Sequence, residues 1–89
     1  MLKLDLTKSA ADYLTALEAK QARQCWNKIV SLMKDPRPND SIDIGEEYFR
    51  TDIGERRIVY RFDALCLYIA VVRNRNDGEV YKQFKNKKL

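Results

Sequence analysis

Six arginines between residues 50 and 75 are the side chains of this chain best suited to chemistry on an anion. Every basic residue in that segment is an arginine, whereas the nine lysines lie before residue 35 or after residue 81; the six are Arg50, Arg56, Arg57, Arg61, Arg73 and Arg75. A guanidinium presents a planar fork of N–H donors that can bind two phosphate oxygens at once. The segment therefore predicts a phosphate-binding site.

The spacing of these arginines decides which of them can act together. Residues two apart on a strand share a face, so Arg57 and Arg61 project together, and Arg73 and Arg75 do so if their strand continues. Arg50 approaches Arg57 if the strands on either side of a turn at 53–54 pair with each other. Like charges that close repel, and a phosphate between them would relieve the repulsion.

A solvated surface is the alternative interpretation of the same arginines. Acidic residues of the segment can neutralise them as surface ion pairs, which contribute only about 0–1 kcal/mol each; these acids are Asp52, Glu55, Asp77 and Glu79. Composition leaves both interpretations open.

The overall composition excludes several classes of chemistry. The chain has 89 residues, a net charge of +4 from 17 basic and 13 acidic side chains, and no histidine. Histidine-based triads, imidazole acid–base catalysis and the usual catalytic zinc sites are therefore excluded. We expect no metal and no other cofactor, and we expect Cys25 and Cys66 to be free thiols.

Length and hydropathy predict one domain over residues 1–89, with a basic C-terminal tail at 82–89. The tail carries four lysines and no acidic residue. No apolar run approaches the roughly 18 residues of a transmembrane helix, and residues 1–5 lack the apolar centre of a signal peptide. We therefore expect a cytoplasmic protein without membrane contact.

The first half of the chain predicts a strand followed by helices. Leu2, Leu4 and Leu6 alternate with polar residues, and Thr7 or Ser9 can cap a helix. Apolar residues then recur at helical spacing up to the prolines at 36 and 38, which indicates two helices or one long bent helix; they are Ala10, Tyr13, Leu14, Leu17, Ala22, Cys25, Trp26, Ile29 and Met33. We expect the larger of them, Trp26 included, to pack in the core.

The second half predicts strands. Residues 35–45 form a breaker-rich linker, 48–52 and 56–62 form a hairpin, and 65–72 is an apolar run typical of a central strand. A turn at 76–78 leads to a short strand at 79–81. The predicted fold is α+β, in the order β-α-α-β-β-β, with two N-terminal helices on one face of a twisted, mainly antiparallel sheet of four to five strands.

Two strings of residues carry a resemblance to a known family. The chain resembles the RelE/ParE superfamily of bacterial toxins at residues 52–61 (DIGERRIVYR) and 75–82 (RNDGEVYK). The opening strand, the sequence LTKSA at 6–10 and the helical region ending at Asp35 are also similar to that family. The resemblance covers residues 2–84. It implies two N-terminal helices on a twisted antiparallel sheet, in agreement with the predicted elements.

The resemblance implies the toxin of a type II toxin–antitoxin system, held inactive by a cognate antitoxin. A RelE-like toxin is a ribosome-dependent mRNA endonuclease that inhibits translation and needs no metal, with the ribosome and mRNA as its partners. A ParE-like toxin instead inhibits DNA gyrase by binding it, without nuclease activity. We favour the endonuclease and keep the gyrase inhibitor as the alternative.

The resemblance also implies roles for individual residues. Arg57, Arg75 and Tyr81 match catalytic positions: the arginines stabilise the transition-state phosphate, and Tyr81 is the candidate acid or base, or alternatively stacks on a nucleobase. We expect the phosphates of the substrate to be bound by Arg50, Arg61, Arg73, Lys82 and Lys85.

The chain departs from the family at two lysines that RelE toxins carry on the strand before the hairpin turn. The corresponding positions are Arg50, which keeps the positive charge, and Asp52, which reverses it. An arginine is a poor general base, because it stays protonated at neutral pH. Asp52 could itself act as a base, but its place beside the turn favours hairpin capping.

Overall fold

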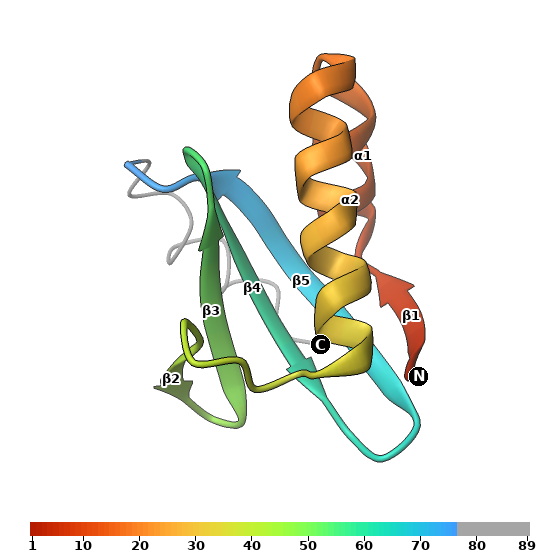
Figure 1. The fold of residues 1–89 in the computed structure, drawn as a ribbon, viewed down its shortest axis with the longest axis vertical. Helices are drawn as coiled ribbons and strands as arrows, with labels where there is room; N and C mark the ends of the chain where they lie inside the picture. Colours follow the sequence, from red (N-terminus) through yellow and green to blue (C-terminus); the bar gives the residue numbers. More distant parts are fainter. Residues whose placement is uncertain (77–89) are drawn as a thin grey trace.

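In the computed structural model, which describes residues 1–76, two helices cover one face of a five-stranded sheet (Figure 1). The elements are β1 (Lys3–Leu6), α1 (Lys8–Ala16), α2 (Ala19–Lys34), β2 (Ile42–Gly45), β3 (Tyr48–Ile53), β4 (Arg56–Phe62) and β5 (Cys66–Asn74). The strand order is β1-β5-β4-β3-β2, with β1 parallel to β5 and the other neighbours antiparallel. The predicted α+β class is confirmed, and the strand predicted at 79–81 lies outside the described residues.

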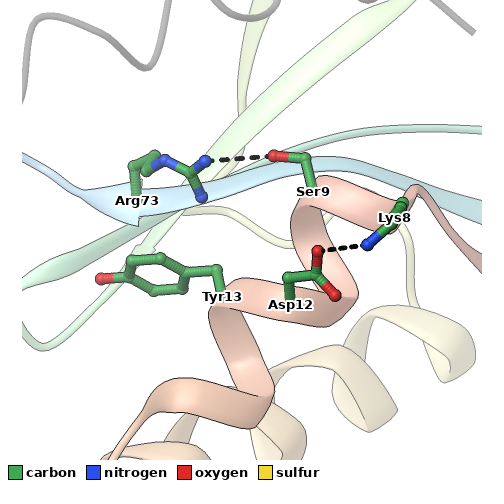
Figure 2. Close-up of a pocket in the computed structure, with 5 residues that line it drawn as sticks. All are labelled: Lys8, Ser9, Asp12, Tyr13 and Arg73. Carbon is green, nitrogen blue, oxygen red and sulfur yellow. Dashed lines mark hydrogen bonds and ion pairs between the residues drawn. The ribbon is translucent and has the colours of Figure 1, made fainter.

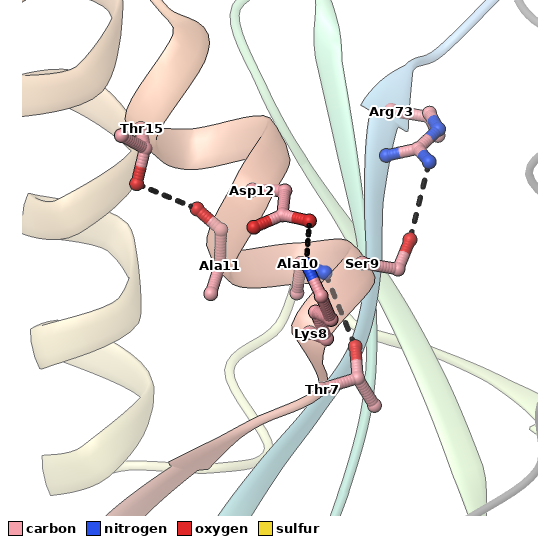
Figure 3. Close-up of polar contacts among 8 residues, drawn as sticks. All are labelled: Thr7, Lys8, Ser9, Ala10, Ala11, Asp12, Thr15 and Arg73. Carbon is pink, nitrogen blue, oxygen red and sulfur yellow. Dashed lines mark hydrogen bonds and ion pairs between the residues drawn. The ribbon is translucent and has the colours of Figure 1, made fainter.

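Thr7 begins α1 and ties it to the sheet. Its hydroxyl oxygen accepts a hydrogen bond from the Ala10 amide at 3.1 Å and donates one to the Ala70 carbonyl of β5 at 2.6 Å. Figure 3 shows the first of these bonds at the start of the helix. Thr7, and not Ser9, is therefore the cap. The chain leaves α1 in extended conformation at Leu17, so the helical region is two helices rather than one.

The main core lies between the helices and the sheet. Its buried side chains come from α1, α2 and three strands, β3, β4 and β5: Ala10, Leu14, Cys25, Ile29, Leu32, Phe49, Ile58, Tyr60, Leu67, Ile69 and Val72. The Tyr60 hydroxyl donates a 2.7 Å hydrogen bond to the Pro36 carbonyl, and burial raises the pKa of this phenol to about 12. The linker after α2 is thereby joined to the central strand.

Two predictions about this half of the molecule were wrong in detail. Trp26 is 37% exposed, because Cys25, Ile29 and Leu32 form the stripe of α2 that faces the sheet and Trp26 lies on its flank. The predicted linker 35–45 also contains β2, which pairs with β3 at the edge of the sheet. This strand is only four residues long and mostly exposed, so the alternation of Ile42 and Ile44 in it is too short to distinguish a strand from the surrounding linker.

The opposite face of the sheet carries a second, smaller cluster. Tyr48, Val59, Ala70 and Val71 are buried there, and no helix residue belongs to this cluster. Val59 lies opposite Arg50 in the β3–β4 ladder, and directly paired antiparallel residues share a face. Arg50, and by alternation Arg57 and Arg61 on β4, therefore lie on the face turned away from the helices.

The β3–β4 turn and the end of β5 meet at one end of the sheet (Figure 1). Arg56 pairs with Asn74, and just beyond it the Arg75 amide donates a 2.8 Å hydrogen bond to the Glu55 carbonyl in the turn. Gly54 takes a φ of +58° in this turn, a backbone conformation that glycine adopts without strain. The hairpin thus brings residues from three strands to the same end.

Candidate phosphate-binding site

Asp52 and Arg57 form the centre of the candidate site. They face each other across the β3–β4 ladder, one on each side of the turn. Arg57 donates from Nε to Asp52 Oδ1 at 2.8 Å and from Nη2 to Oδ2 at 3.2 Å, so the guanidinium fork is paired with both carboxylate oxygens. Hairpin capping by Asp52 is therefore the wrong interpretation. Its side chain forms a two-bonded ion pair across the strands.

Two further arginines act on the same carboxylate. The hydrogen bond from Arg57 holds the pKa of Asp52 below its ordinary value, and the charges of Arg57, Arg50 and Arg75 lower it further, against the effect of burial. Arg50 comes from β3, Arg57 from β4, and Arg75 follows the end of β5. We call Arg50, Asp52, Arg57 and Arg75 the arginine cluster. It gathers three positive charges and one negative charge at the turn end of the sheet.

Arg61 lies on the same face as Arg57 but at the other end of β4. Its guanidinium stacks on the Tyr68 ring, with Cζ 4.0 Å from the ring centroid. Arg61 is four positions along the strand from Arg57, a span of roughly 13 Å. The structure therefore confirms the shared face but does not bring Arg61 into the arginine cluster.

Arg73 is directed to the helix layer instead. It lies opposite Arg57 in the β4–β5 ladder, yet its Nη2 donates to the Ser9 hydroxyl of α1 at 3.1 Å and its Nη1 donates to the Val72 carbonyl at 2.8 Å. Its Cζ also lies 5.1 Å from the centroid of the Tyr13 ring. The guanidinium of Arg73 is thus held on α1, away from the Asp52–Arg57 pair.

A pocket of about 500 Å³ lies beside Arg73, between α1 and β5 (Figure 2). It is lined by Lys8, Ser9, Asp12, Tyr13 and Arg73. Lys8 pairs with Asp12 at 2.8 Å, as Figures 2 and 3 show, so the pocket contains its own counter-ion for one of its two cations. The pocket is separate from the arginine cluster, which lies on the surface of the sheet.

The remaining predicted site residues fall outside the described part of the chain. Tyr81, Lys82 and Lys85 belong to this group. Within residues 1–76, no three acidic, cysteine or histidine side chains are grouped as a metal site would require. In the same part of the chain, neither helix has the length and apolar character needed to span a membrane. Cys25 and Cys66 are free thiols, as predicted.

Asp52 was expected from the sequence as one of several possible counter-ions, but its pair with Arg57 was not predicted. The signal was available: in a hairpin whose turn lies at 53–56, residues 52 and 57 are the first pair beyond it. Tyr68 was missed altogether as the ring beneath Arg61, because the apolar run 65–72 gives no indication of which of its members faces the arginines.

Comparison with solved structures places the fold. A doubly substituted Escherichia coli toxin RelE in the free state superposes with a TM-score of 0.82 at 18% identity, over 99% of this chain and 98% of that one. RelE in the intact E. coli RelBE toxin–antitoxin complex gives 0.74 at 16% identity, over 86% and 100% of the two chains. The archaeal RelE–RelB complex from Pyrococcus horikoshii gives 0.70 at 15% identity, over 86% and 98%.

Sequence comparison adds nothing to this likeness. No protein-family model matches the chain, and no curated protein is significantly similar to it in sequence. Identities below 20% are evidence for the fold alone. The structural agreement nonetheless extends over nearly the whole of both chains in the first comparison. The protein has the fold of the RelE toxins.

Proposed function

We propose that this protein is the toxin of a toxin–antitoxin pair and acts as a RelE-like, ribosome-dependent mRNA endonuclease in the cytoplasm. The observation that carries the proposal is the arginine cluster, which gathers guanidinium groups from β3, from β4 and from the residue after β5 at one end of a RelE-fold sheet. Three cations in one place suit a reaction in which negative charge accumulates on phosphorus-bound oxygens.

The proposed reaction is internal transfer at an RNA phosphodiester. The 2′-oxygen forms a bond to phosphorus and loses its proton to a base, while the bond from phosphorus to the 5′-oxygen breaks and that oxygen gains a proton. The products are a 2′,3′-cyclic phosphate and a 5′-hydroxyl. Arg57 and Arg75 stabilise the doubly charged transition state, and Arg50 positions the phosphate. Tyr81 is proposed as the acid or base.

The proposed partner is a cognate antitoxin. Antitoxin RelB accompanies RelE in the E. coli and P. horikoshii complexes that share this fold. For this chain, we propose an acidic or amphipathic antitoxin segment that lies across the sheet and the helices. Such a segment would complement the toxin chain, which has a net charge of +4 and a tail at 82–89 with four lysines and no acidic residue.

Cleavage of a defined message in a purified translation system tests the enzymatic proposal. Addition of the protein should produce new 3′ ends at the codon held in the ribosomal decoding site, and removal of ribosomes should abolish them. Tyr81→Phe should lower the cleavage rate by about 10²- to 10⁴-fold, the usual contribution of acid–base catalysis. A message that stays intact at micromolar protein would contradict the proposal.

Inhibition of DNA gyrase remains the second candidate, and the Asp52–Arg57 pair is the observation that favours it. A negative charge in the cluster, at a position where RelE toxins carry lysine, weakens the case for catalysis. A ParE-like toxin would use the basic tail and the helical pair as a contact surface. A supercoiling assay run beside the cleavage assay separates the two: unaffected gyrase at micromolar protein would exclude this candidate.

A further inference from the structure

We infer that Asp52 is an internal counter-ion that holds Arg57 in place and must give way to the substrate phosphate when RNA binds. The inference rests on the proposed function, because it concerns the same cluster. It assigns a role to the one residue of the cluster that is negatively charged and would repel the expected substrate. Asp52 is therefore a positioning residue that acts through Arg57.

The geometry of the pair resembles that of a bound anion. Two parallel N–H···O contacts join the Arg57 guanidinium to both oxygens of Asp52, at 2.8 and 3.2 Å. A phosphate group binds an arginine fork with two oxygens in the same way. The N–H donors that Asp52 occupies cannot serve a phosphate at the same time, so binding through this edge of Arg57 requires the carboxylate to leave.

The surrounding charges explain why a carboxylate is present at all. Arg50, on the same strand as Asp52, and Arg75, in the segment after β5, act on Asp52 together with Arg57. Without ligand, three guanidinium groups at one end of the sheet would repel one another. The Arg57 side chain is only 16% exposed and that of Asp52 is 33% exposed, so solvent screens this repulsion incompletely. Asp52 relieves it while the site is empty.

Displacement of Asp52 weakens binding of the substrate and of the transition state alike. The carboxylate must leave the Arg57 fork in both cases, so the cost of breaking the ion pair is the same. The transition state of the proposed reaction carries a second negative charge, and the arginines bind it more strongly than the singly charged phosphodiester. Asp52 therefore raises KM and leaves kcat unchanged, as an interaction that acts equally on the two states does.

The test is the affinity of the full-length protein for a single-stranded RNA oligonucleotide whose 2′-hydroxyls are all methylated, so that cleavage is blocked. Fluorescence anisotropy at several salt concentrations compares the wild type with Asp52→Asn. We expect the variant to bind about 3- to 10-fold more tightly at 0.1 M salt. The slope of log affinity against log salt should steepen by about 0.7, the value for one more cation facing a single strand.

Matched variants separate this effect from a general gain in positive charge. Asp5→Asn makes the same change in net charge on exposed β1, at the far edge of the sheet, and should alter affinity by less than about 2-fold. Asp52→Glu keeps the carboxylate and should bind as the wild type does. In the cleavage assay, Asp52→Asn should lower KM without raising kcat.

A measurement on the unaltered protein guards against a folding defect in Asp52→Asn. Titration with the methylated oligonucleotide should shift both the Arg57 Nε–H resonance and the Asp52 carboxyl carbon resonance, because the two groups separate. A shift of Arg57 with no change at Asp52 would overturn the inference.

Two affinity results would also overturn it: no gain in Asp52→Asn, or an equal gain in Asp5→Asn. If no variant binds the oligonucleotide, the inference is overturned as well. In each case, the ribosomal cleavage assay decides the proposed function independently.

Discussion

At the scale of single residues, Asp52 determines how the arginines of the sheet are to be understood. The sequence predicted that Arg50 approaches Arg57 if the strands on either side of the turn pair, and the β3–β4 ladder confirms the pairing, but it left open whether solvent, local acids or a phosphate balances their charge. The structure places one carboxylate against Arg57 within reach of the other two charges. Side-chain pairing of this kind depends on rotamers, which a sequence pattern does not specify, although the register that permits it follows from the turn.

The pH dependence of stability follows from the same residue. The pKa of Asp52 is lowered in the folded protein, so its contribution is fully present above its ordinary pKa of about 3.9 and is lost as the pH falls through the lower, folded value. Asp52→Asn should therefore destabilise the protein by about 0.5–1 kcal/mol at pH 7, as a partly exposed ion pair does.

Thermal melts of Asp52→Asn and the wild type at pH 7, 5 and 3 check this expectation. The difference in free energy of unfolding should be the same at pH 7 and 5 and should shrink at pH 3. Asp5→Asn is the control, because Asp5 has no ion pair in the described structure. A difference that grows toward pH 3 would contradict the assignment.

At the scale of elements, the parts with strong local patterns could be predicted and the parts held by distant partners could not. The alternating residues of β4 and the apolar run of β5 gave the central strands, and the stripe of α2 gave its buried face. By contrast, β2 is a short exposed edge strand, and its strand conformation depends on pairing with β3 rather than on a pattern in its own residues. The parallel pairing of β1 with β5 joins residues more than sixty positions apart and leaves no local signal.

Thr7 provides a test of how α1 is held on the sheet. Its hydroxyl bonds both the first turn of α1 and the Ala70 carbonyl of β5, so Thr7→Ala removes a cap and an inter-element hydrogen bond together. We expect a loss of about 1–2 kcal/mol, the usual range for a threonine cap.

Thr15→Ala is the matched control for Thr7→Ala. The Thr15 hydroxyl bonds only the Ala11 carbonyl within α1, on the exposed side of the helix (Figure 3). Alanine is also the better helix former, so this variant should be neutral or slightly stabilising. Urea denaturation measures the free energy of unfolding of both variants. Equal losses in the two would show that Thr7 has no special role.

At the scale of the whole molecule, the positive charge is divided between two regions of the chain. The sequence separates an arginine-only segment from a lysine-rich tail, and the structure places Arg50, Arg57 and Arg61 of the former on the face of the sheet turned away from the helices. Part of that segment is used elsewhere, because Arg73 is held on α1 and Arg61 on Tyr68. Only long-range packing decides which arginines meet, and that is the information a linear pattern lacks.

Removal of residues 82–89 should weaken target binding more than folding. This segment has four lysines and only two large apolar residues, Phe84 and Leu89, so it offers charge rather than core. The truncated protein should retain its melting temperature within about 4 °C, equivalent to less than about 1 kcal/mol. It should inhibit translation less than the full chain does. Unfolding of the truncated protein in a thermal melt would contradict this prediction.

In the proposed reaction, the arginine cluster stabilises the charged transition state of RNA cleavage. The single-turnover cleavage rate of Arg75→Ala on a ribosome–mRNA complex tests this role. The Arg75 side chain is exposed, so its removal should leave the fold intact. Arg23→Ala, which removes the same charge from the exposed surface of α2, is the control. We expect Arg75→Ala to cleave about 10²- to 10³-fold more slowly than the wild type, the cost of removing one transition-state donor, and Arg23→Ala to stay within about 3-fold of the wild type. Equal rates for the two variants would contradict it.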